Sequence, residues 1–183
     1  MVVVNLYPFK KKVEEECSWE EAIENIDIGG PSMIRSAAKN HADVSVLVDP
    51  SQYKDFIEEI KKGPLHKDFK MKLAFEAFQH TASYDSAISN WMSKEKDLVP
   101  SNFLESFPLI KQLRYGENPH QKALWYGLNN IGWNSAEQLQ GKELSYNNLL
   151  DLESALSTVL EFGYEETNYR TSNTFASVIL KHN

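Results

Sequence analysis

The hydrophobic positions of this chain form short apolar runs separated by longer stretches with helical spacing. Two runs rich in β-branched residues, Val2–Leu6 and Val44–Val48, are typical of short buried strands. Pro8 follows the first run, so we expect the first strand to end near Tyr7. The two strands are therefore expected to be separated by about forty residues of other structure.

Helical signals fill the remainder of the first hundred residues. Ser18 and Glu21 have the spacing of a capping box at a helix start. Residues at steps of three and four form one mainly apolar stripe along the longest pattern, which we interpret as core: Phe69, Leu73, Ala77, Thr81, Tyr84, Ile88 and Trp91. The predicted helices span residues 19–25, 33–40, 52–62 and 65–92. Strands alternating with helices predict an α/β fold, a parallel α/β layer sandwich.

The pattern changes in the second half of the chain. Residues 93–112 contain two prolines and mixed charge, which is typical of a linker. Residues 113–127 indicate strand and turn, and Ser145–Phe162 has the pattern of a helix. A final apolar run, Phe175–Leu180, predicts a buried strand that leads directly into Lys181 and His182.

Composition narrows the class of protein. No apolar run approaches the ~20 residues that cross a bilayer, so no membrane association is expected. The single cysteine, Cys17, excludes an internal disulfide and fits a reducing cytoplasm. The net charge of −7 argues against nucleic-acid binding. The histidines His41, His66 and His80 lack partners at metal-ligand spacing, so we predict no metal site.

One loop-to-helix segment combines groups suited to anion binding and proton transfer. Gly29 and Gly30 allow close approach of the backbone to a ligand at a helix N-terminus. Arg35 and Lys39 share a helix face, and Asp27 precedes the turn. Such a set can bind a phosphorylated ligand and move protons. An exposed basic helix face after an ordinary loop is the alternative.

Three other polar groups lie beside predicted strands. Tyr7 is placed where a ligand of an α/β sheet would bind, or else it is a core aromatic with a hydrogen-bonded hydroxyl. Arg114 and Tyr115 open a turn in which arginine could clamp a phosphate or carboxylate, unless the turn is merely polar. His182 is a proton carrier near neutral pH, and Lys181 could hold an anion or control its protonation.

Five stretches in order resemble one family. They are VVVNLYPF, ENIDIGGPSMIRSAAKNH, LRYGENPHQ, LSYNNLLDLESAL and VILKHN. Together they resemble the bifunctional AICAR transformylase/IMP cyclohydrolase family of purine synthesis, almost from end to end. The resemblance implies that residues 1–107 are the C-terminal part of an IMP cyclohydrolase domain with a methylglyoxal-synthase-like fold. Residues 108–183 would be a linker and the N-terminal part of a cytidine-deaminase-like AICAR transformylase domain.

The resemblance also implies the chemistry and its residues. A transformylase of this family moves a formyl group from 10-formyltetrahydrofolate to AICAR, and the cyclohydrolase closes the product, FAICAR, to IMP without a cofactor. Cyclohydrolase positions match Tyr7, Asp27 and Lys39. Transformylase ligand-binding positions match Arg114, Tyr115 and Asn148, and its catalytic pair matches Lys181 and His182. His182 would take the proton of the amine while Lys181 controls its protonation.

The resemblance further implies a cytoplasmic homodimer. The chain is expected to be an internal fragment across the domain junction, because the family has a phosphate-binding portion before NLYPF and most of its transformylase after the final stretch. Alone it is expected to have neither activity, or nearly none. A non-catalytic module that binds an anionic nucleotide through Arg35 and Lys39, or packs against a partner, is the alternative function.

Overall fold

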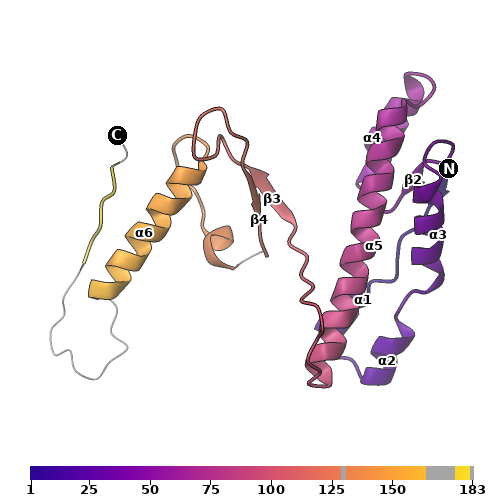
Figure 1. Ribbon diagram of the computed structural model, residues 1–183, viewed down its shortest axis with the longest axis horizontal. Coiled ribbons are helices and arrows are strands. Elements are labelled where there is room, and N and C mark those ends of the chain that lie inside the picture. The colour runs from indigo at the N-terminus through magenta and orange to yellow at the C-terminus, as the bar shows by residue number, and fades with distance from the viewer. Residues whose placement is uncertain (129–130, 164–175, 182–183) are drawn as a thin grey trace. The chain divides into compact units, whose positions relative to one another are not determined.

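A computed structural model describes residues 1–128, 131–163 and 176–181. The chain divides into two compact units, Met1–Ser106 and Phe107–Asn183, which are considered separately below. In the first unit, the elements in chain order are β1 Val2–Val3, α1 Phe9–Glu14, α2 Trp19–Glu24, α3 Gly29–Lys39, β2 Val46–Leu47, α4 Gln52–Lys61 and α5 Lys67–Glu95 (Figure 1).

The two predicted strands pair in parallel, as expected for strands joined by helices. Val2 lies opposite Val46 and Val3 opposite Leu47. The hydrogen-bonded part of β1 is shorter than predicted, and its side chains are only half-buried, since Val3 is 45% exposed. Only one face of β1 is covered, so alternate side chains along residues 2–7 point toward solvent.

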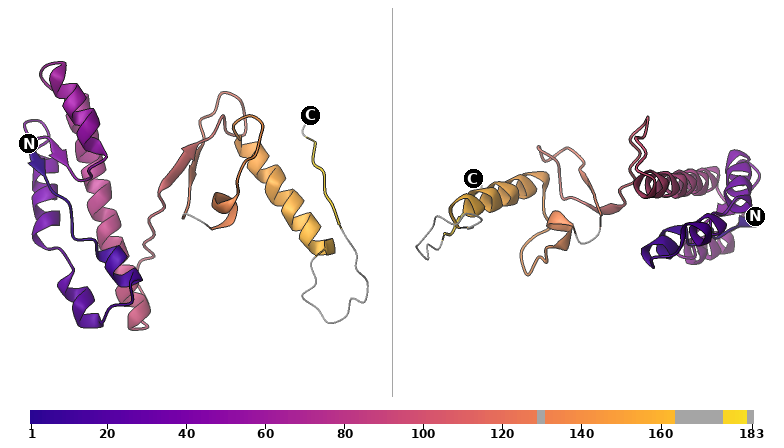
Figure 2. Two further views of the ribbon diagram at one scale, coloured as in Figure 1. Left: turned by 180° about the vertical axis from the view of Figure 1, so that it is seen from behind. Right: turned by 90° about the horizontal axis from the view of Figure 1, so that it is seen from below.

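β2 is the centre of the core because both of its faces are covered. Val46 and Val48 pack with Ile34 of α3 and Ala77 of α5. The intervening Leu47 points to the opposite face, where it packs with residues of α4 and α5, namely Phe56, Tyr53, Leu73 and Phe69, and with Leu65. α3 and α5 run side by side in both further views (Figure 2).

The local helix signals are confirmed in the first unit. Ser18 Oγ accepts from Glu21 N at 3.2 Å and Ser18 N donates to the Glu21 carboxylate at 3.0 Å, which completes the capping box of α2. The apolar stripe of α5 packs as predicted, with Leu73 and Ala77 buried. The helix over residues 33–40 is confirmed and includes Pro31 in its first turn, where proline is favoured, but it already begins at Gly29, so Gly29 and Gly30 do not interrupt it. The Asp27 carboxylate accepts the backbone N–H of Gly30 and so supports this earlier start.

Helix α1 was missing from the sequence prediction. Its sequence, FKKKVE, has only two apolar residues, four positions apart. Phe9 is 1% exposed and packs edge-on against Tyr84 and Trp91, with ring centroids 6.3 and 5.5 Å apart. Contact with the distant α5 therefore gives α1 a buried anchor that six residues cannot reveal by themselves.

The second unit contains a small antiparallel sheet and one long helix. Its elements are β3 Leu109–Gln112, β4 Leu124–Tyr126, the 3-10 helix η1 Gly132–Ser135 and α6 Tyr146–Gly163. β3 and β4 pair antiparallel, with Gln112 opposite Leu124. The predicted helix Ser145–Phe162 is confirmed by α6, whereas residues 109–112 of the predicted linker form a strand.

The predicted final strand is not formed by the residues that the structure describes. Ala176–Lys181 has no strand assignment, and Ile179 is 92% exposed. A strand needs a neighbouring strand for its N–H and C=O groups, and the described part of this unit pairs only β3 with β4. Phe175, the first residue of that predicted strand, lies outside the described residues.

The fold class is confirmed at the level of a mixed α/β chain with a small parallel sheet. Its finer assignment to two fold families stays a prediction. None of the helices described here is long and apolar enough to cross a membrane.

Replacing Ile34 by Ala is expected to lower the free energy of unfolding by about 3 kcal/mol, because the truncation leaves a cavity in the core. Ile34 is fully buried, whereas Ile28, six residues earlier, is 76% exposed. Ile28→Ala is the matched control and should change stability by less than about 0.5 kcal/mol. Urea denaturation followed by circular dichroism measures both, and equal effects would contradict the assigned core.

Replacing Ser18 by Ala is expected to cost about 1 kcal/mol, because the backbone N–H of Glu21 loses its capping acceptor. Ser89→Ala, at an exposed position within α5, is the control and should be nearly neutral. The same urea titration decides, and an unchanged stability in Ser18→Ala would show that the cap does not stabilise the fold.

Candidate functional site

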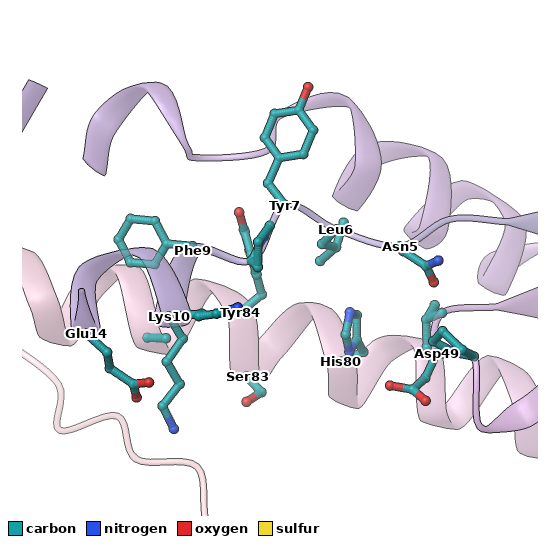
Figure 3. A pocket seen from close by; sticks show the side chains of 15 residues that line it. Asn5, Leu6, Tyr7, Phe9, Lys10, Glu14, Asp49, His80, Ser83 and Tyr84 are labelled. Carbon is teal, nitrogen blue, oxygen red and sulfur yellow. The ribbon is translucent and has the colours of Figure 1, made fainter. Parts of the chain in front are cut away.

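A pocket lies where the two parallel strands end. It has a volume of about 650 Å³ and is lined by residues that follow β1, residues that follow β2 and residues of α5. Figure 3 shows Asn5 and Tyr7 on the segment after β1, with Asp49, His80 and Ser83 on the opposite side. Ligands of open α/β sheets gather at the carboxyl ends of strands, so this edge is the candidate site of the first unit.

Asp27 and Tyr7, twenty residues apart, meet beside this pocket, although Asp27 is not among the residues that line it. One carboxylate oxygen of Asp27, Oδ1, accepts the backbone N–H of Gly30 at 2.7 Å. The other, Oδ2, accepts the backbone N–H of Tyr7 at 3.3 Å. Each carboxylate oxygen can accept a second hydrogen bond, so Asp27 keeps acceptor capacity for a ligand.

The Tyr7 side chain is not part of the core. It is 56% exposed, and its ring points away from the side on which Ser83 and Asp49 lie (Figure 3). Among the described residues its hydroxyl makes no hydrogen bond, so the alternative interpretation as a hydrogen-bonded core aromatic is wrong. The side chain is exposed, so the hydroxyl is accessible to a ligand.

The two glycines of the turn differ in their surroundings. A Cβ on Gly30 would lie 2.6 Å from Asp27 Oδ2 and 2.6 Å from a methyl carbon of Leu6. Gly30 is therefore required so that Asp27 and Leu6 can pack against the start of α3. A Cβ on Gly29 would meet nothing within 4 Å, so Gly29 leaves open space next to the helix N-terminus.

The two basic residues of α3 lie toward its other end. Arg35 is exposed and places its guanidinium carbon 5.6 Å from the ring centroid of Phe78. Lys39 is exposed and is the last residue of α3. At 1.5 Å per residue it lies about 14 Å along the helix axis from Gly30. The structure therefore brings Asp27, Tyr7 and Gly30 together, and places Lys39 apart from them.

The pocket also contains titratable groups that were not among the predicted site residues. Burial lowers the pKa of His80, and the Asp49 carboxylate only partly offsets this. The Nε2 atom of His80 is buried without a hydrogen-bond partner among the described residues. Hydrogen bonds from Ser51 lower the pKa of Asp49. Burial raises the pKa of Tyr84, which was assigned to the core stripe.

Tyr84 is the site residue that sequence reasoning missed. Its hydroxyl accepts the backbone N–H of Asp27 at 2.9 Å and donates to the carbonyl oxygen of Asn25 at 3.4 Å. The sequence signal is weak, because Tyr84 is one of two hydroxyl-bearing residues, with Thr81, on a mainly apolar stripe.

In the second unit, backbone hydrogen bonds fix the segment that carries Arg114 and Tyr115. Arg114 N donates to the Leu144 carbonyl at 2.9 Å, and Tyr146 N donates to the Tyr115 carbonyl at 3.1 Å. The Arg114 guanidinium lies over the neighbouring Tyr115 ring and donates to its hydroxyl at 3.3 Å. The arginine is exposed, and its other donors are left for a ligand.

Arg114 and Asn148 line one pocket of about 700 Å³. The Asn148 side-chain oxygen accepts from the backbone N–H of Ser145, while Asn148 N donates to Ser145 Oγ. Ser145 thus caps α6, Asn148 completes the reciprocal capping pair, and Asn148 also lines this pocket. Leu180 lines the same pocket, and Lys181, the next residue in the chain, is exposed. His182 lies outside the described residues.

No group of three or more His, Cys, Asp or Glu side chains that could hold a metal ion occurs within the described ranges. The two pockets differ in character. The first combines acidic, basic and imidazole groups around strand ends, and the second combines an arginine with a capped helix start.

Comparison with known proteins supplies the family. The model of a family described as AICARFT/IMPCHase bienzyme matches residues 37–183. The bifunctional purine biosynthesis protein PurH of Prochlorococcus marinus strain MIT 9515 is 85% identical over 183 residues. The PurH proteins of P. marinus subsp. pastoris strain CCMP1986 and of strain MIT 9211 are 79% and 57% identical.

Each of these matches covers 100% of this chain and 35% of the relative, so the chain spans about a third of the length of its curated relatives. The family match covers more than half of the chain and includes part of the first pocket and all residues that line the second. The chain therefore belongs to the AICARFT/IMPCHase bienzyme family.

Proposed function

We propose that this chain supplies parts of both active sites of a bifunctional enzyme that catalyses the last two steps to IMP. The observation that carries this proposal is the 85% identity over all 183 residues to a protein named bifunctional purine biosynthesis protein. The two compact units support it, because each holds its own pocket beside residues that resemble one of the two active sites.

The first unit is proposed to act in cyclisation of FAICAR. In this reaction the carboxamide nitrogen attacks the formyl carbon, a C–N bond forms, and the former carbonyl oxygen leaves as water. The carboxamide nitrogen and the formamide nitrogen each lose one proton, a C=N bond forms between the formyl carbon and the formamide nitrogen, and the oxygen gains both protons. The Asp27 carboxylate, held by Gly30 and Tyr7, is suited to receive a proton, and the free Tyr7 hydroxyl is suited to orient the formyl oxygen or a water.

The remaining cyclohydrolase residues are proposed to bind the nucleotide. Gly29 leaves space at the N-terminus of α3, where free N–H groups attract an anion. Arg35 presents an exposed guanidinium further along the same helix. Lys39 lies about 14 Å along that helix from Gly30. Its role in this proposal rests on the family resemblance, and the geometry of the chain does not add to it.

The second unit is proposed to act in formyl transfer from 10-formyltetrahydrofolate. The amine nitrogen of AICAR attacks the formyl carbon, the bond to the folate nitrogen breaks, and a proton passes from the amine to the leaving nitrogen. Arg114, Tyr115 and Asn148 are proposed to bind the nucleotide beside the 700 Å³ pocket. His182 is proposed as the base and Lys181 as the residue that controls its protonation, in a homodimer of the whole protein.

A non-catalytic module that binds an anionic nucleotide is the second candidate. The observation in its favour is the exposure of Arg35 and Lys39 on the surface of α3. It predicts binding of FAICAR or IMP without turnover and without any dependence on Asp27. The two candidates therefore differ in what happens when the carboxylate of Asp27 is replaced.

The cyclohydrolase proposal is tested in a full-length chimera in which this chain replaces the matching 35% of the strain MIT 9515 relative. Asp27→Asn keeps a helix-capping oxygen but removes the base, so kcat for FAICAR cyclisation should fall by about 10²- to 10⁴-fold. Asp43→Asn, at an exposed position in the turn after α3, is the matched control and should retain wild-type kcat. Cyclisation is followed by the absorbance of IMP.

Turnover by Asp27→Asn within threefold of the parent would overturn the assignment of Asp27. A chimera that binds FAICAR without cyclising it would instead favour the binding module.

The transformylase proposal is tested in the same chimera with Arg114→Ala. Loss of a charged hydrogen bond to the nucleotide of about 1.5–3 kcal/mol should raise KM for AICAR by about 10- to 100-fold. Lys122→Ala, which removes another exposed positive charge a few residues away, should leave this KM unchanged. An equal KM in both variants would contradict a nucleotide contact by Arg114.

A further inference from the structure

One hydroxyl connects helix α5 to the loop that carries Asp27. Tyr84, on α5, accepts the backbone N–H of Asp27 at 2.9 Å and donates to the carbonyl oxygen of Asn25 at 3.4 Å. Asn25 is the C-cap residue of α2, and Asp27 lies two residues before α3 begins. The hydroxyl therefore fixes the loop that connects these two helices.

The Tyr84 side chain also packs against a buried ring. Its ring packs edge-on against Phe9, which is 1% exposed and in turn packs against Trp91. Figure 3 shows Tyr84 rising from α5 toward the segment that carries Tyr7 and Phe9. Burial raises the pKa of the phenol, so the hydroxyl keeps its proton at neutral pH. It can therefore donate and accept at the same time.

The hydrogen bond from Asp27 N to the Tyr84 hydroxyl helps to set the position of the Asp27 carboxylate. With its backbone N–H fixed by Tyr84, the side chain reaches Gly30 N at 2.7 Å and Tyr7 N at 3.3 Å. The absence of a Cβ at Gly30 leaves just enough room for this placement. Two segments distant in sequence thus contact Asp27: the Tyr7 backbone meets its carboxylate, and the Tyr84 hydroxyl meets its backbone N–H and joins it to the long helix.

We propose that Tyr84 is a positioning residue for cyclisation, acting through Asp27. This inference rests on the proposed cyclohydrolase function. Loss of the hydroxyl frees the loop between α2 and α3, so the carboxylate spends less time in the orientation that meets the substrate. Displacement of a reacting group by about 1 Å is enough to slow a reaction by up to about a hundredfold.

The test is Tyr84→Phe in the full-length chimera, since this change removes only the hydroxyl. We expect kcat for FAICAR cyclisation to fall by about 10- to 100-fold. KM for FAICAR should change by less than threefold, and formyl transfer in the same molecule should be unchanged. Tyr53→Phe is the matched control, because the Tyr53 hydroxyl also makes one contact between distant segments, to Asn5 at 3.3 Å. It should leave both activities unchanged.

A double variant separates positioning from general loss of stability. If Tyr84 acts through Asp27, Tyr84→Phe combined with Asp27→Asn should cyclise no more slowly than Asp27→Asn alone. Independent, additive losses would overturn the inference. Cyclisation by Tyr84→Phe within twofold of the parent, or a loss shared equally by formyl transfer, would also overturn it.

Amide hydrogen exchange supplies a measurement that does not depend on turnover. Exchange at the Asp27 and Gly30 amides should be at least several-fold faster in Tyr84→Phe, and unchanged in Tyr53→Phe. If the parent chimera fails to cyclise FAICAR, the proposed function is overturned, and unchanged exchange at these two amides would then overturn the positioning role as well. Faster exchange at these amides would show that the Tyr84 hydroxyl stabilises the loop between α2 and α3 even without cyclisation.

Discussion

The Asp27 carboxylate is the interaction on which the candidate site of the first unit depends. Its two oxygens accept backbone N–H groups from the segment after β1 and from the first turn of α3. These two segments, both among the described residues, are not paired by backbone hydrogen bonds. The Asp27 side chain connects them instead, as backbone pairing connects neighbouring strands in a sheet. Because the helix N-terminus carries partial positive charge, a carboxylate is favoured there over a neutral residue.

The surrounding architecture makes that interaction possible. β2 is buried on both faces, and α5 packs against both with neighbouring residues, Leu73 on one side and Ala74 and Ala77 on the other. This fixes α5 beside α3 and brings Tyr84 to the loop before α3. The same long helix thus completes the core near β2 and, three turns later, holds the backbone of Asp27.

In the second unit, one residue also has both a structural role and a place in the pocket. Asn148 completes the start of α6 by hydrogen bonding with Ser145 and also lines the pocket that contains Arg114. A residue that both takes part in a helix cap and lines a pocket is held in one orientation before any ligand arrives. The Arg114 backbone is likewise fixed by the Leu144 carbonyl, which leaves its guanidinium as the adaptable part.

Much of the local structure could be predicted from the sequence, because the forces involved act within a few residues. The Ser18–Glu21 capping box, the stripe on α5 and the helix after Ser145 all depend on spacings of three or four positions. Helix α1 and the shortened β1 were missed because their limits are set by packing and pairing with distant segments. Residues 109–112 appeared to be linker for the same reason, since their strand exists only through pairing with β4.

The sequence by itself determined which side chains have the chemistry, namely the carboxylate of Asp27, the phenol of Tyr7 and the guanidinium of Arg114. Only the tertiary structure decided which of them meet. It joined Asp27 to Tyr7 and Gly30, placed Lys39 at the far end of α3, and turned Tyr84 from a core residue into a support for Asp27. The physical reason is that the hydrogen bond between Tyr84 and Asp27 spans 57 positions of the chain. No local pattern encodes a contact over that separation, and only the packing of α5 against the sheet creates it.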